Sequence, residues 1–133
     1  MNAKQFLSRG RWIEREITAL IRTRDETRDR LTHITQNYDS DGAQSTKDPH
    51  KFDGLVELEY RLDERIDALY AVKAEILDTI GRLDDSRERI ALQKYYIDML
   101  SWEQVAVELN YTWRQTMRIR KTALEHIETI IMS

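Results

Sequence analysis

The sequence predicts an all-α protein in which a long antiparallel helical hairpin, a coiled-coil arm, precedes a trihelical helix-turn-helix unit. The chain has 133 residues; four are Gly and one is Pro, whereas 34% are charged. Such a composition is typical of all-helical chains. Two long segments carry apolar residues every three or four positions, and the segment after them holds two closely spaced helix-start signals.

Residues 1–84 are predicted to form the hairpin. In its first helix the apolar seam begins near Phe6 and runs through Ile13, Ile17, Leu20, Arg24, Thr27, Leu31, Ile34 and Tyr38. In the second helix it runs through Phe52, Leu55, Leu62, Ile66, Leu69, Ile76, Ile80 and Leu83. A period of about 3.5 residues is the signal of a coiled coil. The polar segment between the helices contains Gly42 and Pro49, so a loop is expected over about residues 37–51.

Polar residues interrupt the seam at Arg24, Glu59 and Lys73. We expect them to pair across the hairpin or to set its register; a notch that binds a partner is the alternative. Further apolar residues lie off the seam, where two helices alone cannot bury them: Val56, Leu58, Tyr70, Val72 and Leu77. Dimerisation of two identical chains through the arm is therefore expected.

Residues 85–133 are predicted to form the helix-turn-helix unit. Ser101 with Gln104, and Thr112 with Gln115, have the spacing of capping boxes, which start helices. Asn110 lies between them, and Asn is the non-Gly residue best suited to the left-handed position that ends a helix. The three helices are expected over Arg87 to about Leu100 (capped by Asp85 or Ser86), Trp102–Leu109, and Trp113 to about Ile131.

The last of these helices is locally basic. Residues 1–85 carry a net charge of −4 and residues 86–133 of +1, although the whole chain carries −3. The second helix of such a unit can enter the DNA major groove, where Arg114 and Arg118 would contact guanine, and Arg120 and Lys121 phosphates. The alternative is that these Arg and Lys side chains only form the solvated face of the helix. The candidate DNA-binding residues are Thr112, Trp113, Arg114, Met117, Arg118, Arg120 and Lys121.

Two Trp residues follow the caps. Trp102 is expected to pack back on the preceding helix, over Tyr95 or Met99. Trp113 should face outward, toward DNA or a protein partner, because exposed Trp is uncommon without a function. A core position for Trp113, with the helix rotated, is the alternative.

The residues around this unit show a family pattern. They are Lys94-Tyr95-Tyr96-Ile97-Asp98, Ser101-Trp102-Glu103-Gln104-Val105-Ala106, Leu109-Asn110-Tyr111-Thr112 and Ala123-Leu124-Glu125-His126-Ile127. Residues 92–124 thereby resemble region 4 of sigma factors of the sigma-70 family, with Asn110 in place of the usual turn Gly and Thr116 in place of Ile or Val. The whole chain resembles the small ArpU-like late transcriptional regulators of Gram-positive prophages.

The resemblance implies a DNA-binding transcription regulator, phage-derived, whose partners are double-stranded DNA and RNA polymerase. Two alternatives belong to other classes. One is a phage DNA-packaging protein like the small terminase subunits, which form large rings. The other is a protein-interaction module whose helix-turn-helix no longer contacts DNA.

Other functions have weaker support. The many carboxylates of the arm could bind magnesium in an enzyme, but interleaved Arg residues favour a solvated coiled-coil flank, so no enzyme is expected. The chain has no Cys, and His33, His50 and His126 each lack a second ligand one turn away, so neither a metal nor another cofactor is expected. No apolar run approaches the roughly 20 residues that span a bilayer, and the N-terminal residues lack the apolar core of a signal peptide. We therefore expect a cytoplasmic protein with no membrane partner.

Overall fold

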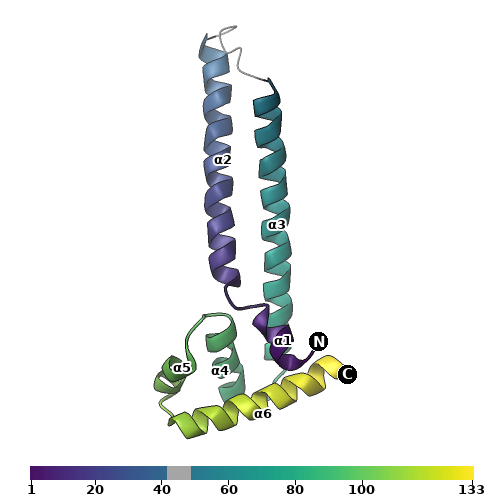
Figure 1. Cartoon of the computed structure of the whole chain (residues 1–133), viewed down its shortest axis with the longest axis vertical. Coiled ribbons are helices and arrows are strands. Elements are labelled where there is room, and N and C mark those ends of the chain that lie inside the picture. Colours follow the sequence, from purple (N-terminus) through teal and green to yellow (C-terminus); the bar gives the residue numbers. More distant parts are fainter. Residues whose placement is uncertain (42–48) are drawn as a thin grey trace. The chain divides into compact units, whose positions relative to one another are not determined.

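The computed structural model describes the backbone of residues 1–41 and 49–133, and the side chains of residues 1–34 and 50–133. All regular structure in this part of the chain is α-helical (Figure 1), which confirms the predicted all-α class. The helices are α1 (Ala3–Ser8), α2 (Ile13–Asp41), α3 (Pro49–Gly81), α4 (Ser86–Tyr96), α5 (Trp102–Leu109) and α6 (Trp113–Met132).

The chain divides into two compact units, Glu16–Leu69 and a second one made of Met1–Arg15 with Tyr70–Ser133. This boundary differs from the expected one at residue 85. The reason is a shared core: Leu7 of α1 and Ile76 of α3 are buried in the same cluster as Leu92 of α4. The apolar residues at the start and at the end of residues 1–84 therefore pack against the C-terminal helices. The sequence periodicity is the same for this packing as for packing within a hairpin, so it cannot distinguish the two.

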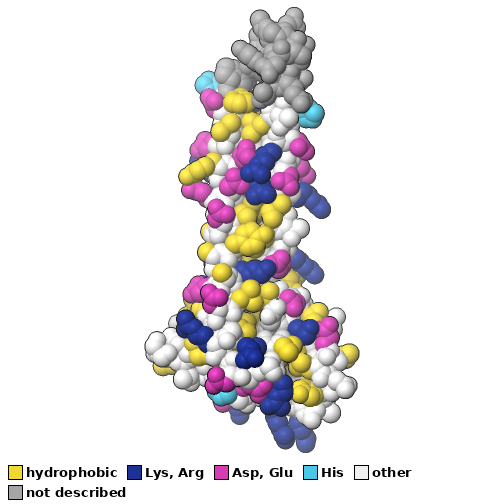
Figure 2. Space-filling view, turned by 180° about the vertical axis from the view of Figure 1, so that it is seen from behind, with side chains coloured by type: hydrophobic (Ala, Val, Ile, Leu, Met, Phe, Trp, Pro, Cys, Tyr) yellow, Lys and Arg dark blue, Asp and Glu magenta, His cyan; other side chains and the backbone are white. Residues whose placement is uncertain are grey.

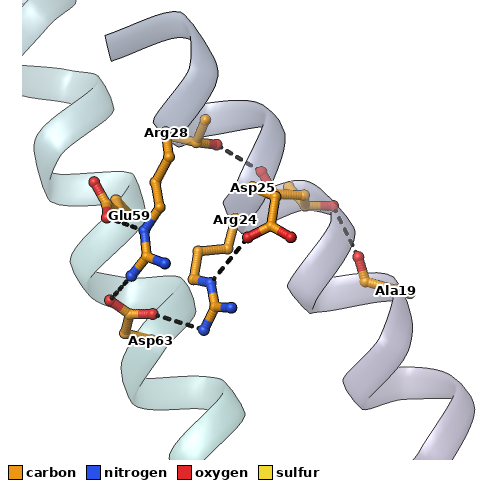
Figure 3. Close-up of polar contacts among 8 residues, drawn as sticks. Ala19, Arg24, Asp25, Arg28, Glu59 and Asp63 are labelled. Carbon is orange, nitrogen blue, oxygen red and sulfur yellow. Dashed lines mark hydrogen bonds and ion pairs between the residues drawn. The ribbon is translucent and has the colours of Figure 1, made fainter. Parts of the chain in front are cut away.

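Within the unit Glu16–Leu69, α2 and α3 lie side by side (Figure 1) and are joined by ion pairs. Arg24 Nη1 lies 3.3 Å from Asp63 Oδ1, and Arg28 contacts both Glu59 and Asp63 (Figure 3). Arg24 of α2 thus pairs with Asp63 of α3, and Glu59 of α3 with Arg28 of α2, so each of these two polar seam residues has the expected partner on the other helix. In the other unit Lys73, the third polar seam residue, pairs with Glu14.

Helix α1 is separated from α2 by a turn that the sequence periodicity missed. Trp12 adopts a left-handed backbone with φ 70°, and Gly10 is buried. A Cβ at Gly10 would lie 2.9 Å from Ile97 Cδ1 and 3.1 Å from the Tyr96 carbonyl oxygen. Only Gly allows this close approach of two backbones, and the turn lets α1 pack beside the C-terminal helices.

Two further expected boundaries are corrected. Residues 37–41 and 49–51, which were expected in the loop, are helical: α2 continues to Asp41, and α3 starts at Pro49, a residue favoured at the first helical position. Residues 42–48 and the side chain of Tyr38 lie outside the described residues. Helix α4 ends at Tyr96 instead of Leu100, since Met99 adopts a left-handed backbone with φ 63°.

Long-range contacts stabilise the end of α4. The Arg11 guanidinium donates to the carbonyl oxygens of Tyr95 (2.6 Å) and Leu100 (3.2 Å). The Tyr95 carbonyl is one of the last carbonyls of α4, which have no partner within their own helix. Arg11 also stacks on the Tyr95 ring at 4.1 Å, so the segment before α2 fixes the direction in which the chain leaves α4.

Candidate nucleic-acid interface

The turn between α5 and α6 is fixed by local hydrogen bonds. Asn110 has φ 59° and ψ 42°, which confirms the expected left-handed position, and the Tyr111 N–H donates to the Ala106 carbonyl at 3.0 Å. Each of the two helices starts with the predicted capping box. At α6 the Gln115 N–H donates to Thr112 Oγ1 (3.1 Å) and the Thr112 N–H to Gln115 Oε1 (2.9 Å). The Thr112 hydroxyl thus positions the start of α6.

Three of the predicted site residues form a single exposed basic stripe on α6. Arg114, Arg118 and Lys121 are exposed, and at positions i, i+4 and i+7 they share one helix face. None of the three has an ion-pair or hydrogen-bond partner among the described residues. Their charges are therefore free for an external anion.

The α6 residues that flank this stripe differ in exposure. Trp113 keeps 52% of its surface exposed, which confirms that it faces outward. Met117 is partly buried, because it packs against the core. It can offer only part of its side chain to a ligand. Figure 2 shows Lys and Arg side chains gathered in its lower part, where α6 runs in Figure 1.

Arg120 occupies a different environment from the other bases. Its guanidinium lies over the Trp102 ring, 5.5 Å from the centroid, and Trp102 in turn stacks on Tyr95 at 4.4 Å. With Arg11 on the far face of Tyr95, the four side chains form a continuous stack. The expected packing of Trp102 on Tyr95 is confirmed, whereas Arg120 packs between α5 and α6 rather than extending freely toward a phosphate. Sequence spacing alone groups Arg120 with the basic run.

Thr116 sits at the point where the family pattern has an apolar residue. The side chain is fully buried, and its hydroxyl donates to the Thr112 carbonyl at 2.9 Å. A hydroxyl bonded within its own helix has no unsatisfied group, so it can occupy an apolar contact. The departure at Thr116 is therefore compatible with tight packing of α6.

Glu108 of α5 and Glu88 of α4 each pair with a basic side chain. Glu108 Oε2 is 2.7 Å from Lys94 Nζ, and this hydrogen bond raises the pKa of Lys94. The buried Glu88 carboxylate contacts His126 Nδ1 at 2.9 Å. This hydrogen bond raises the pKa of His126.

The carboxylates of the arm are the second set of candidate residues. Among residues 1–34 and 50–133, no three His, Asp or Glu side chains come together as a metal site would need. No helix in this part of the chain is long and apolar enough to cross a bilayer. Several arm carboxylates are held by Arg side chains, as in the pairs Arg65–Glu16 and Arg61–Glu57.

No family model, curated protein or solved structure matches the chain. The interface therefore rests on its own geometry.

Proposed function

We propose that α4–α6 form a helix-turn-helix resembling region 4 of sigma factors, and that the protein binds double-stranded DNA sequence-specifically to regulate transcription. The observation that carries this proposal is the exposed, unpaired stripe of Arg114, Arg118 and Lys121 on α6. An Arg side chain can donate to guanine O6 and N7 together, and a Lys can neutralise a phosphate.

The geometry before α6 supports this role. A base-contacting helix must enter the groove at a fixed angle, and here both helix starts are capped and the turn between them is closed by backbone hydrogen bonds. The stack of Trp102 against Tyr95 and Arg120 holds α5 and α6 on α4. Such rigidity lowers the entropic cost of ordering the side chains that contact the bases.

The test begins with selection of bound fragments from bacterial and phage genomic DNA at a stated salt concentration. An enriched sequence motif is expected. Affinity for that motif is then measured for Arg114→Ala and Arg118→Ala, each of which should lose about 1–3 kcal/mol if it contacts a base. Arg22→Ala and Arg30→Ala remove exposed Arg side chains of α2 and serve as matched controls with unchanged affinity. Selection without any enriched motif would overturn the proposal.

We further propose that the protein acts as a homodimer through the arm. Val56 and Leu58 of α3 keep 45% and 41% of their surfaces exposed, and Tyr70 keeps 46%. Figure 2 shows such apolar side chains interleaved with charged ones along the arm. Val72 and Leu77, by contrast, pack partly on the core of their own unit, so they are not included in the proposed dimer surface.

Light scattering at micromolar concentration tests the dimer, for which twice the 15.9 kDa chain mass is expected. A measured mass equal to that of one chain would refute the dimer proposal. A ring of many copies would favour a DNA-packaging adaptor over a regulator, while the DNA interface would stay the same.

A further inference from the structure

Helix α1 lies against the second half of α6, although the two are at opposite ends of the sequence. The Ala3 N–H donates to Glu128 Oε2 at 2.6 Å, and Phe6 and Leu7 are buried in the core that also contains Ala123 and Ile127. A groove runs between the helices, lined on one side by Asn2, Ala3 and Lys4, and on the other by α6 residues that include Met117 and Lys121. The N-terminal segment is thereby placed beside the basic stripe.

Lys4 is the cation that α1 presents in this groove. It is exposed, and it has no ion-pair partner among the described residues. Two backbone N–H groups at the start of α1 are already engaged, Ala3 with Glu128 and Gln5 with the Asn2 side chain. The Lys4 ammonium group is therefore the cationic donor that α1 leaves unpaired among the described residues.

Charge around the groove indicates which way a polyanion would extend. Along α6 the stripe ends at Lys121, because Glu125 follows on the same face one turn later. Glu128, the next acid, has its carboxylate committed to the Ala3 N–H. Lys4 and Lys121 line the same groove, together with Glu125. Helix α6 carries no Lys or Arg after Lys121, so the next cation at this groove is Lys4 of α1.

We propose that α1 is part of the DNA interface and that Lys4 contacts a backbone phosphate beside the one neutralised by Lys121. This proposal rests on the proposed DNA binding of α6. A phosphate contact of this kind adds affinity without base preference, because it releases a condensed counterion from the duplex.

The test measures affinity for a duplex carrying the selected motif, and for a scrambled duplex, over a series of salt concentrations. Lys4→Ala should lower the slope of log K against log salt by about 0.9, the value for one phosphate, for both duplexes. The ratio of the two affinities should stay unchanged. Lys4→Arg keeps the charge and should restore the slope, whereas Lys51→Ala removes an exposed Lys from α3 and should leave it unchanged.

The outcomes separate this inference from the function on which it rests. If Arg118→Ala loses affinity for the motif while Lys4→Ala keeps the full salt slope, the role of α1 is refuted and the α6 interface stands. If the Arg114 and Arg118 variants bind as the unchanged chain does, the proposed function itself fails. Thermal unfolding of Lys4→Ala should match that of the unchanged chain, since the side chain is exposed; a large drop in Tm would contradict the assigned position of Lys4.

Discussion

Replacing Leu7 by Ala should destabilise the unit that holds α4–α6, although Leu7 lies more than eighty positions before Trp102 in the sequence. Leu7 is fully buried. The substitution removes three carbon atoms, worth about 2.4 kcal/mol at ~0.8 kcal/mol per buried CH₂ group. The cavity left behind adds to this, so the free energy of unfolding should fall by about 3–4 kcal/mol.

Urea and thermal unfolding followed by Trp fluorescence measure this effect. Trp12, Trp102 and Trp113 all lie in this unit, and Trp102 is 8% exposed and stacks on Tyr95, so the Trp emission reports on the packing of the unit. For a unit of this size, 3–4 kcal/mol corresponds to a fall in Tm of about 12–30 °C. Val107→Ala is the matched control, because Val107 lies in the same unit, is 79% exposed, and its loss should change the free energy by about 0.5 kcal/mol or less. If the fluorescence transition of Leu7→Ala coincides with that of the control, α1 does not share this core.

Three further perturbations have defined outcomes. Gly10→Ala places a Cβ 3.1 Å from the Tyr96 carbonyl oxygen, so the free energy of unfolding in urea should fall by about 1–3 kcal/mol; an unchanged midpoint would mean that the turn before α2 can open. Ser101→Ala removes the cap of α5 and should cost about 1 kcal/mol, whereas Ser101→Asp should preserve stability; equal losses in both variants would contradict the capping role. The hydrogen bond to Glu88 raises the pKa of His126, so its contribution is complete below the unfolded-state pKa of about 6.5 and is lost as pH rises through the folded-state pKa. Urea unfolding at pH 6 and pH 8 should therefore show lower stability at pH 8, and His126→Gln should reduce that difference.

Local signals in the sequence determined much of the C-terminal helices. The capping boxes at Ser101 and Thr112 and the left-handed Asn110 each depend on atoms within a few residues, so their geometry follows from residue type and spacing. The same holds for the exposed positions of Arg114 and Arg118, which follow from helical periodicity once the buried face of α6 is known. The pairing of Arg24 with α3 was also predictable, because a charged residue in an apolar seam needs a partner.

Only the tertiary structure decided which segments share a core. Arg11 bonds to carbonyl oxygens at the end of α4, Arg120 stacks on Trp102, and Ala3 bonds to Glu128. Arg11 and Ala3 lie far in sequence from their partners, so no local spacing marks these contacts. The hydrophobic effect is non-directional, so it does not specify which segments of the chain pack together. Any apolar surface that contacts a seam of helical period can bury it. For that reason the sequence predicted the helices of α4–α6 and the basic face of α6, and the packing alone placed α1 and Lys4 beside it.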